Sequence, residues 1–102
     1  ATFDKAYDVA IQSDGKIVVA GQVHDSDGYD SGLVRYNSDG TLDSSFGNGG
    51  KVRTSFRSTN YSYHLAIQSD GKMIVGGTTA GDFTFTRYYS DGTLDTSLQF
   101  RW

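Results

Sequence analysis

The densest group of side chains that could do chemistry lies in one short stretch, GQVHDSDGYDSG at 21–32. Acidic residues recur in it with a Gly among them, as in loops where carboxylates point at one calcium ion and Gly permits the sharp bend. The match to an EF-hand loop is incomplete, because the Gly comes two residues early and no acidic residue stands at the twelfth position. We expect a solvated hairpin tip, with weak calcium binding as the alternative. The residues are His24, Asp25, Asp27, Tyr29 and Asp30, and the calcium candidates among them are Asp25, Asp27 and Asp30.

Aromatic side chains in or beside the predicted loops form a second group. Aromatic faces next to polar residues can stack on sugar rings, and they serve equally well as anchors for protein contacts. Packing in a core or a subunit interface is the simpler interpretation, and a glycan-binding surface is the alternative. The residues are Tyr29, Tyr61, Tyr63, Phe83 and Trp102.

No residue of the chain is predicted to be catalytic. His24 and His64 are not equivalent in the repeat described below, so each is interpreted as a surface or partly packed histidine. No Ser stands in a nucleophile-elbow context such as G-x-S-x-G, and the chain contains no Cys. The sequence therefore favours a non-enzymatic protein, and a hydrolase with a site in a central channel is the alternative from another class.

These residues are carried by an internal repeat. AIQSDGK occurs at 10–16 and again at 66–72, and LVRYNSDGTLDSSF at 33–46 matches FTRYYSDGTLDTSL at 85–98. The two pairs are offset by 56 and 52 residues, so the first copy carries four extra residues between Gly21 and Leu33. Insertions in repeats usually fall in loops, and this segment is therefore predicted to be a loop.

Each copy is predicted to fold as four short antiparallel strands. Apolar residues alternate before the first SDG and a β-branched run follows it, which indicates a hairpin. The sequence predicts an all-β chain, a single unit over 1–102, with meander repeats at about 6–56 and about 61–102. In SDG the Asp side chain can bond the backbone two residues on and Gly accepts a positive φ. The turn-forming Asp residues are Asp14, Asp39, Asp70 and Asp91.

Two arginines share one register in the two copies. Arg35 and Arg87 each stand inside a predicted strand and are followed by Tyr. A partly buried Arg requires a counter-charge, and Asp43 and Asp95 in the two TLD motifs stand at the next strand end. We predict structural ion pairs between these Arg and Asp residues.

AIQSDGKIVVAG and RYNSDGTLDSSFGNGGKV, together with the second copy, resemble the delta-60 repeats of bacterial proteins, a family assigned to β-propeller-like folds. The similarity covers nearly the whole chain. It implies that the repeats are propeller-like blades, and it implies no established catalytic chemistry. The chain departs from the family in having Ser13 and Ser69 where Pro is common, and its second copy ends in DTSLQFRW without the GNGGKV tail.

Two repeats are too few to cover their own apolar faces, because propellers use about four to eight blades. Residues 1–5 align with the end of a fourth strand, so we expect them to belong to a preceding blade, to which LQFRW at 98–102 could also contribute. We therefore predict closure by homo-oligomerisation, with a trimer as the first expectation, then a tetramer, or a two-chain sandwich. A longer array, of which this chain is an excerpt, is the alternative.

Composition limits the partners. The formal net charge is −3 and the nine basic residues are scattered, so no nucleic-acid partner is expected. No apolar run approaches the roughly 20 residues of a membrane helix, so no membrane partner is expected. The predicted function is a non-enzymatic β-propeller-like module that self-assembles into a ring and serves as a binding or scaffold unit. A glycan or a protein is the expected ligand, and no cofactor is expected apart from the calcium considered above.

Overall fold

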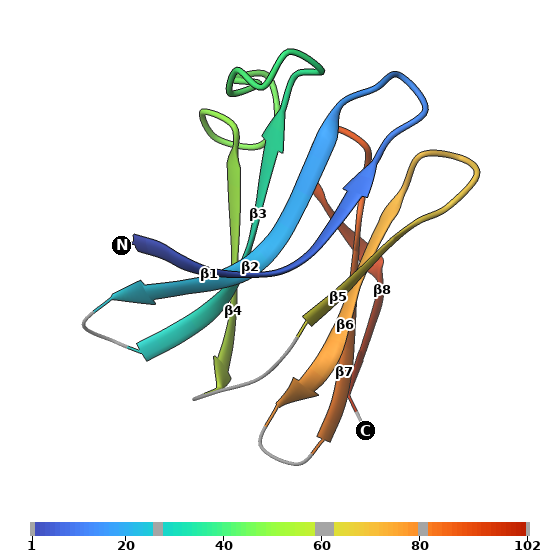
Figure 1. Cartoon of the computed structure of the whole chain (residues 1–102). Helices are drawn as coiled ribbons and strands as arrows, with labels where there is room; N and C mark the ends of the chain where they lie inside the picture. The colour runs from blue at the N-terminus through green and yellow to red at the C-terminus, as the bar shows by residue number, and fades with distance from the viewer. Residues whose placement is uncertain (1, 26–27, 59–62, 80–81, 102) are drawn as a thin grey trace.

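The computed structural model describes residues 2–25, 28–58, 63–79 and 82–101, which form two four-stranded antiparallel sheets (Figure 1). The first sheet, here the N-sheet, has the order β1 (Thr2–Ile11), β2 (Ile17–Asp25), β3 (Gly28–Tyr36) and β4 (Lys51–Ser58). The second, here the C-sheet, has the order β5 (Tyr63–Ile67), β6 (Met73–Thr79), β7 (Asp82–Tyr88) and β8 (Leu94–Arg101). The predicted pair of four-stranded meanders is confirmed. Over these residues the structure contains no helix with the length and hydropathy of a membrane span.

The SDG turns have the predicted geometry. In each turn the Asp Oδ1 accepts a hydrogen bond from the backbone amide two residues later, at 2.8–3.0 Å. The following Gly adopts a positive φ, which an L side chain rarely adopts because its Cβ approaches the carbonyl oxygen. The four glycines are Gly15, Gly40, Gly71 and Gly92, with φ values of 88°, 91°, 90° and 93°.

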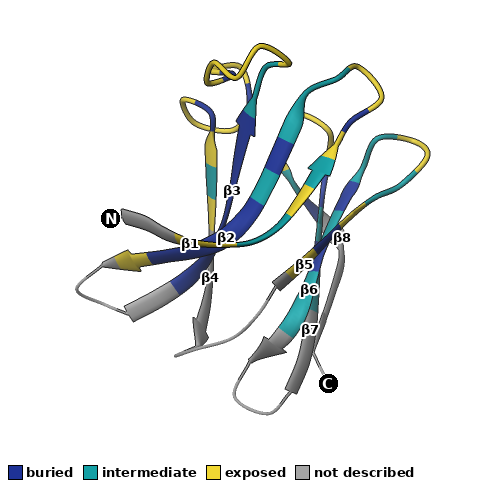
Figure 2. Ribbon diagram, viewed as in Figure 1, coloured by how far each residue is buried: buried dark blue, intermediate teal, exposed yellow. Residues whose placement is uncertain are grey.

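One hydrophobic core lies between the two sheets (Figure 2). Each sheet contributes alternate residues of its strands, because successive side chains of a strand point to opposite faces. Burying each large apolar side chain contributes about 1.5–3 kcal/mol. The N-sheet supplies Val18, Ala20 and Leu33, the turn between β3 and β4 supplies Phe46, and the C-sheet supplies Leu65, Met73, Val75 and Tyr88.

The prediction of a loop at the four-residue insertion is wrong. The residues between Gly21 and Leu33 extend β2 and β3 into a longer hairpin, in which Gln22 pairs with Ser31 and His24 with Tyr29. Gln22 and Ser31 are buried. Extra residues can lengthen a hairpin without changing its register when equal numbers are added on both sides of the tip, because the pairing of opposite residues is then preserved.

The prediction that the opening residues belong to a preceding blade is also wrong. Residues 2–5 are part of β1 and pair with β2, with Thr2 opposite His24 and Phe3 opposite Val23. Two register shifts interrupt this pairing and bend the strand. Gly21 lies opposite Ala6, at a point where any Cβ would overlap the carbonyl oxygen of Lys5. The bend in β1 therefore requires Gly at position 21.

The two copies differ in how they reach their last strand. In the first copy, residues 43–50 form a turn with Gly47, Gly49 and Gly50 at positive φ before β4 begins. In the second copy, β8 begins directly after the SDG turn, at Leu94, and pairs with β7 through one register shift. The second copy therefore has a fourth strand despite the absence of the GNGGKV tail.

Candidate functional site

A buried cluster of interacting charged groups lies at the turn end of the N-sheet. Arg35 Nε donates to Asp43 Oδ2 at 2.9 Å, and Lys16 Nζ donates to the same oxygen at 2.8 Å. The amide and hydroxyl of Ser45 donate to the other oxygen, Oδ1. Arg35 is only 7% exposed and Asp43 only 5%. The hydrogen bonds from Lys16 and Ser45, and the charge of Arg35, hold the pKa of Asp43 far below its usual range. The predicted pairing of Arg35 with Asp43 is confirmed.

Arg35 also connects the two sheets. Its Nη1 atom donates to the Ser90 carbonyl at 2.6 Å, and Ser90 belongs to the last SDG turn of the C-sheet. The same atom donates to Gln12 Oε1 at 3.3 Å, and the guanidinium lies 4.5 Å from the centre of the Phe46 ring. Charge-assisted hydrogen bonds in a site of low dielectric are stronger than neutral ones. Arg35 is therefore a structural centre of the junction between the sheets.

This cluster gives a physical reason for the repeated heptapeptide. In the first AIQSDGK, Gln12 accepts from Arg35 and Lys16 donates to Asp43, so both polar side chains that flank the SDG turn contact the ion pair. Sequence reasoning missed these two roles. The identity of the Gln and Lys in the two copies was the available signal, because a solvated turn requires neither residue.

The second copy repeats the ion pair in a more exposed setting. Arg87 Nε donates to Asp95 Oδ2 at 2.9 Å, as predicted, and Asp95 is 1% exposed. Lys72 Nζ lies 3.9 Å from the same oxygen, and Tyr89 donates to the other oxygen at 3.4 Å. The Arg87 side chain is 20% exposed, compared with 9% for Arg35. The difference arises because the C-sheet covers Arg35, whereas Arg87 lies on the outer face of the C-sheet.

Two backbone groups add further bonds across the junction. The Leu65 amide donates to Asp8 Oδ2 at 2.8 Å, and the Gly47 amide donates to the Asp91 carbonyl at 2.8 Å. The bonds to the carboxylate from the Leu65 and Val9 amides lower the pKa of Asp8. Asp8 was not among the predicted site residues, because it resembles a solvated strand residue in the sequence.

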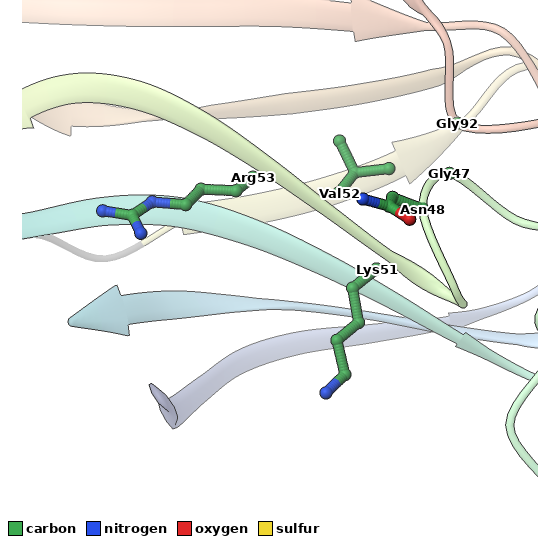
Figure 3. A pocket seen from close by; sticks show the side chains of 6 residues that line it. All are labelled: Gly47, Asn48, Lys51, Val52, Arg53 and Gly92. Atoms are coloured by element: carbon green, nitrogen blue, oxygen red, sulfur yellow. The ribbon is translucent and has the colours of Figure 1, made fainter. Parts of the chain in front are cut away.

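A hollow of ≈ 460 Å³ lies along this junction (Figure 3). Gly47 of the N-sheet turn and Gly92 of the C-sheet turn meet beside Val52, and the side chains of Lys51 and Arg53 extend away from that meeting point. A Cβ on Gly92 would lie 2.9 Å from Val52 Cγ2 and 3.0 Å from the Gly47 amide nitrogen. The absence of side chains at these glycines allows the two backbones to approach closely.

The described candidates from the insertion have separate roles. His24 is exposed near the end of β2. Asp30 is 8% exposed and accepts a hydrogen bond from Arg53 Nε at 2.6 Å, so this calcium candidate is neutralised by an arginine in the structure. Other candidates have a described backbone in strands but no described side chain, namely Asp25, Tyr29, Tyr63 and Phe83. The remaining candidates, Asp27, Tyr61 and Trp102, lie outside the described residues.

The topology places the backbone of the described candidate residues at one end of the two sheets. In a meander, alternate connections lie at opposite ends, and the SDG turns occupy one end of both sheets (Figure 1). His24, Tyr29 and Asp30 lie near the opposite end of the β2–β3 hairpin, and Tyr63 begins β5 at that end. We call this the hairpin end. In the described residues no group of three or more His, Cys, Asp or Glu side chains is arranged to hold a metal ion.

Comparison with known proteins gives one finding on the family. The model of a domain of unknown function, the DUF5122 beta-propeller, matches residues 12–46 and 68–98. These ranges contain all four SDG turns and both Arg–Asp pairs. No curated protein and no solved structure matches the chain significantly.

Proposed function

The chain belongs to the DUF5122 beta-propeller family, and from that premise we propose that it is a non-enzymatic repeat module that self-assembles into a ring and serves as a binding or scaffold unit. Its two copies are assigned as delta-60 repeats on the motifs AIQSDGK and SDGTLD. Each copy supplies one four-stranded blade, and the blades pack face to face as the N-sheet and C-sheet do.

The observation that carries this proposal is the apolar outer face of the N-sheet. Val9 is 59% exposed and Ile11 is 72% exposed, on the face that points away from the C-sheet. Large apolar side chains gathered on one face indicate an interaction site. The roles of the polar groups agree with a structural module, because the described Arg–Asp pairs and SDG carboxylates each satisfy a partner within the fold.

The mass of the chain in solution tests self-assembly. One chain has a mass of 11.1 kDa, so a ring of three chains and six blades would have a mass of about 33 kDa. Sedimentation equilibrium or native mass spectrometry between about 1 and 100 μM measures it. A mass of about 33 or 44 kDa supports a ring of six or eight blades, and a mass of about 22 kDa replaces the ring by a dimer. A monomer at all concentrations overturns the proposal.

The binding role is assigned to the hairpin end. Strand ends and the connections between them carry ligand sites in many rigid β scaffolds, and Tyr29 and Tyr63 place aromatic residues there. A glycan is the proposed ligand, because aromatic rings stack on sugars. Tyr29→Ala or Tyr63→Ala should weaken binding to a glycan array, whereas Tyr89→Phe at the SDG end should leave it unchanged. A chain that binds no glycan on the array, or variants that bind as well as the original, would exclude this role for the two tyrosines.

A further inference from the structure

We infer that a second copy of this chain docks head to tail, with the outer face of its C-sheet against the outer face of the N-sheet of the first copy. This inference rests on the proposed self-assembly and specifies its geometry. The contact repeats the junction that already joins the two sheets within one chain. In that contact, Arg87 of one copy donates to the Ser38 carbonyl of the next.

The two outer faces are complementary because the internal junction is directional. The C-sheet uses Leu65, Met73, Val75 and Tyr88 to contact the N-sheet. By the repeat offsets, the equivalent N-sheet residues are Val9, Ile17, Val19 and Tyr36. Strand pairing places these four on one face, since Val9 is opposite Val19 and Ile17 is opposite Tyr36. That face points away from the C-sheet, and Val9 and Ile11 are exposed on it.

The same reasoning identifies the other half of the contact. The N-sheet uses Val18, Ala20 and Leu33 to contact the C-sheet, and their equivalents are Ile74, Gly76 and Phe85. These three lie together on the outer face of the C-sheet, because Gly76 is opposite Phe85 and Ile74 is opposite Arg87. Each is only partly buried. Among the described residues, the internal junction therefore leaves one face of each type without a covering sheet, and a repeated heterologous contact joins them.

A hollow on the N-sheet face fits this docking. It measures ≈ 150 Å³ and is lined by Val19, Gly21, Val34, Tyr36 and neighbouring β1 residues. The equivalent surface of the C-sheet, around Val75 and Tyr88, is filled by N-sheet side chains in the internal junction. Residues equivalent to those side chains, on a second copy, have the position and the apolar character to fill the hollow.

A second observation, independent of the apolar faces, comes from the arginines. Arg35 Nη1 donates to Gln12 Oε1 and to the Ser90 carbonyl of the sheet that covers it. Gln68 is the equivalent of Gln12, and its Oε1 atom is buried with no hydrogen-bond partner among the described residues. An unsatisfied buried acceptor costs about 1–3 kcal/mol. A covering sheet would order the guanidinium of Arg87 as it orders that of Arg35, and would thereby satisfy Gln68.

The acceptor for Arg87 follows from the repeat. Ser38 is the equivalent of Ser90, and it stands in the SDG turn of the N-sheet. A Cβ on Gly40, in the same turn, would meet no described atom within 4 Å, whereas a Cβ on Gly92 would contact the N-sheet. The turn at 38–40 therefore has the open surroundings that docking of a second copy requires.

Two variants that each block one face test the direction of docking. Val9→Lys with Ile11→Lys charges the N-sheet face, and Ala66→Lys charges the C-sheet face; these three side chains are exposed, so folding is preserved. Each variant alone should be a monomer, because every head-to-tail contact needs both faces. An equimolar mixture should form a 1:1 dimer and nothing larger, since only one compatible pair of faces remains. Ser44→Lys adds the same charge in an exposed turn and should assemble as the original chain does.

The outcomes separate this inference from the proposed function. If the original chain assembles but one face variant alone still dimerises, the contact is a two-fold sandwich and head-to-tail docking is wrong. Head-to-tail docking is also wrong if both variants are folded by circular dichroism and monomeric by mass, and their mixture does not dimerise. A monomeric original chain overturns the proposed self-assembly itself.

Arg87→Lys supplies a separate readout for the arginine. Lys retains a charge beside Asp95 but has only one nitrogen, so it cannot donate to Asp95, Gln68 and a second copy in the fixed geometry of a guanidinium. We introduce Arg87→Lys into the variant with Val9→Lys and Ile11→Lys, whose C-sheet face is intact. We expect the dissociation constant of its mixed dimer to rise about 10- to 100-fold. In the Ala66→Lys variant, whose C-sheet face is blocked, the same Arg87→Lys substitution should leave the dissociation constant of the mixed dimer unchanged. An unchanged dissociation constant in the first arrangement overturns the role of Arg87.

Discussion

Replacing Gly92 by Ala tests the junction between the two sheets, and replacing Gly40 by Ala provides the matched control. Both glycines end an SDG turn, and their φ values of 93° and 91° are nearly the same. The backbone strain of a Cβ at positive φ, about 1–2 kcal/mol, is therefore common to both variants. The difference between them measures what the added methyl group contacts.

The structure sets the size of that difference. A Cβ at position 92 would lie 2.9 Å from Val52 Cγ2, 3.0 Å from the Gly47 nitrogen and 3.2 Å from Phe46 Cε1. All three atoms belong to the N-sheet or its last turn, and the backbone nitrogen cannot rotate away. A Cβ at position 40 would meet no described atom within 4 Å. Overpacking of this kind costs about 1–3 kcal/mol.

Urea unfolding of the two variants and the original chain measures the effect. We expect Gly92→Ala to lose about 1–3 kcal/mol more than Gly40→Ala, or about 4–8 °C in Tm for each kcal/mol. The measurement uses a concentration at which all three proteins are monomers, because assembly adds to apparent stability and a docked second copy would cover the turn that contains Gly40. Equal losses for the two variants would show that the last turn does not pack against Val52 and Gly47, and the junction described above would then be incorrect.

Three further predictions concern single residues. Asp8→Ala removes the acceptor of the Leu65 amide; because this bond lowers the pKa of Asp8 in the folded state below its ordinary value of 3.8, the stabilisation is present above about pH 4 and lost as the pH falls through the lower folded pKa. The variant should thus be less stable at pH 7 and equal to the original near the acid limit, and a constant difference at every pH in urea titrations would contradict this. Arg35→Met should lower the free energy of unfolding by about 3 kcal/mol, since it leaves buried acceptors in both sheets unpaired, and a loss below about 1 kcal/mol in the same assay would exclude a central role at the junction. Gly21→Ala should cost about 3 kcal/mol, because its Cβ would overlap the Lys5 carbonyl, and an unchanged melting temperature would refute the bend in β1.

Local chemistry accounts for the features that could be predicted from the sequence. The SDG turns depend on residues within four positions of one another, and Asp14 and Gly15 act as their types dictate. The pairing of Arg35 with Asp43 was also accessible, because the two are eight residues apart and recur together in the second copy. A repeated charge inside a strand needs a partner, and few acidic residues are near.

The features that could not be predicted depend on contacts between distant segments. The bond between Asp8 and the Leu65 amide joins residues 57 positions apart and leaves no pattern in one sequence. Phe46 follows two serines and resembles a strand end, yet it is 0% exposed, because the turn at 43–50 folds it under Arg35. The insertion was misread for a related reason. Its Gly, Ser and Asp residues are typical of loops, and only pairing with the opposite strand makes them β.

The two copies have nearly the same sequence at their ion pairs, so the differences between them come from what covers each copy. Arg35 donates to an acceptor in the other sheet and to Gln12, whereas Arg87 retains the Asp95 pair, and the repeat position Gln68 has an oxygen that no described residue hydrogen-bonds. Arg87 and Lys72 lie beside the buried Asp95 of their own copy, whereas the Gln68 Oε1 atom has no hydrogen-bond partner among the described residues. The presence of Gln68 in the second copy agrees with a covering sheet that orders the guanidinium of Arg87 as the C-sheet orders that of Arg35. For the second copy, the face that fits is the one that the first copy leaves exposed.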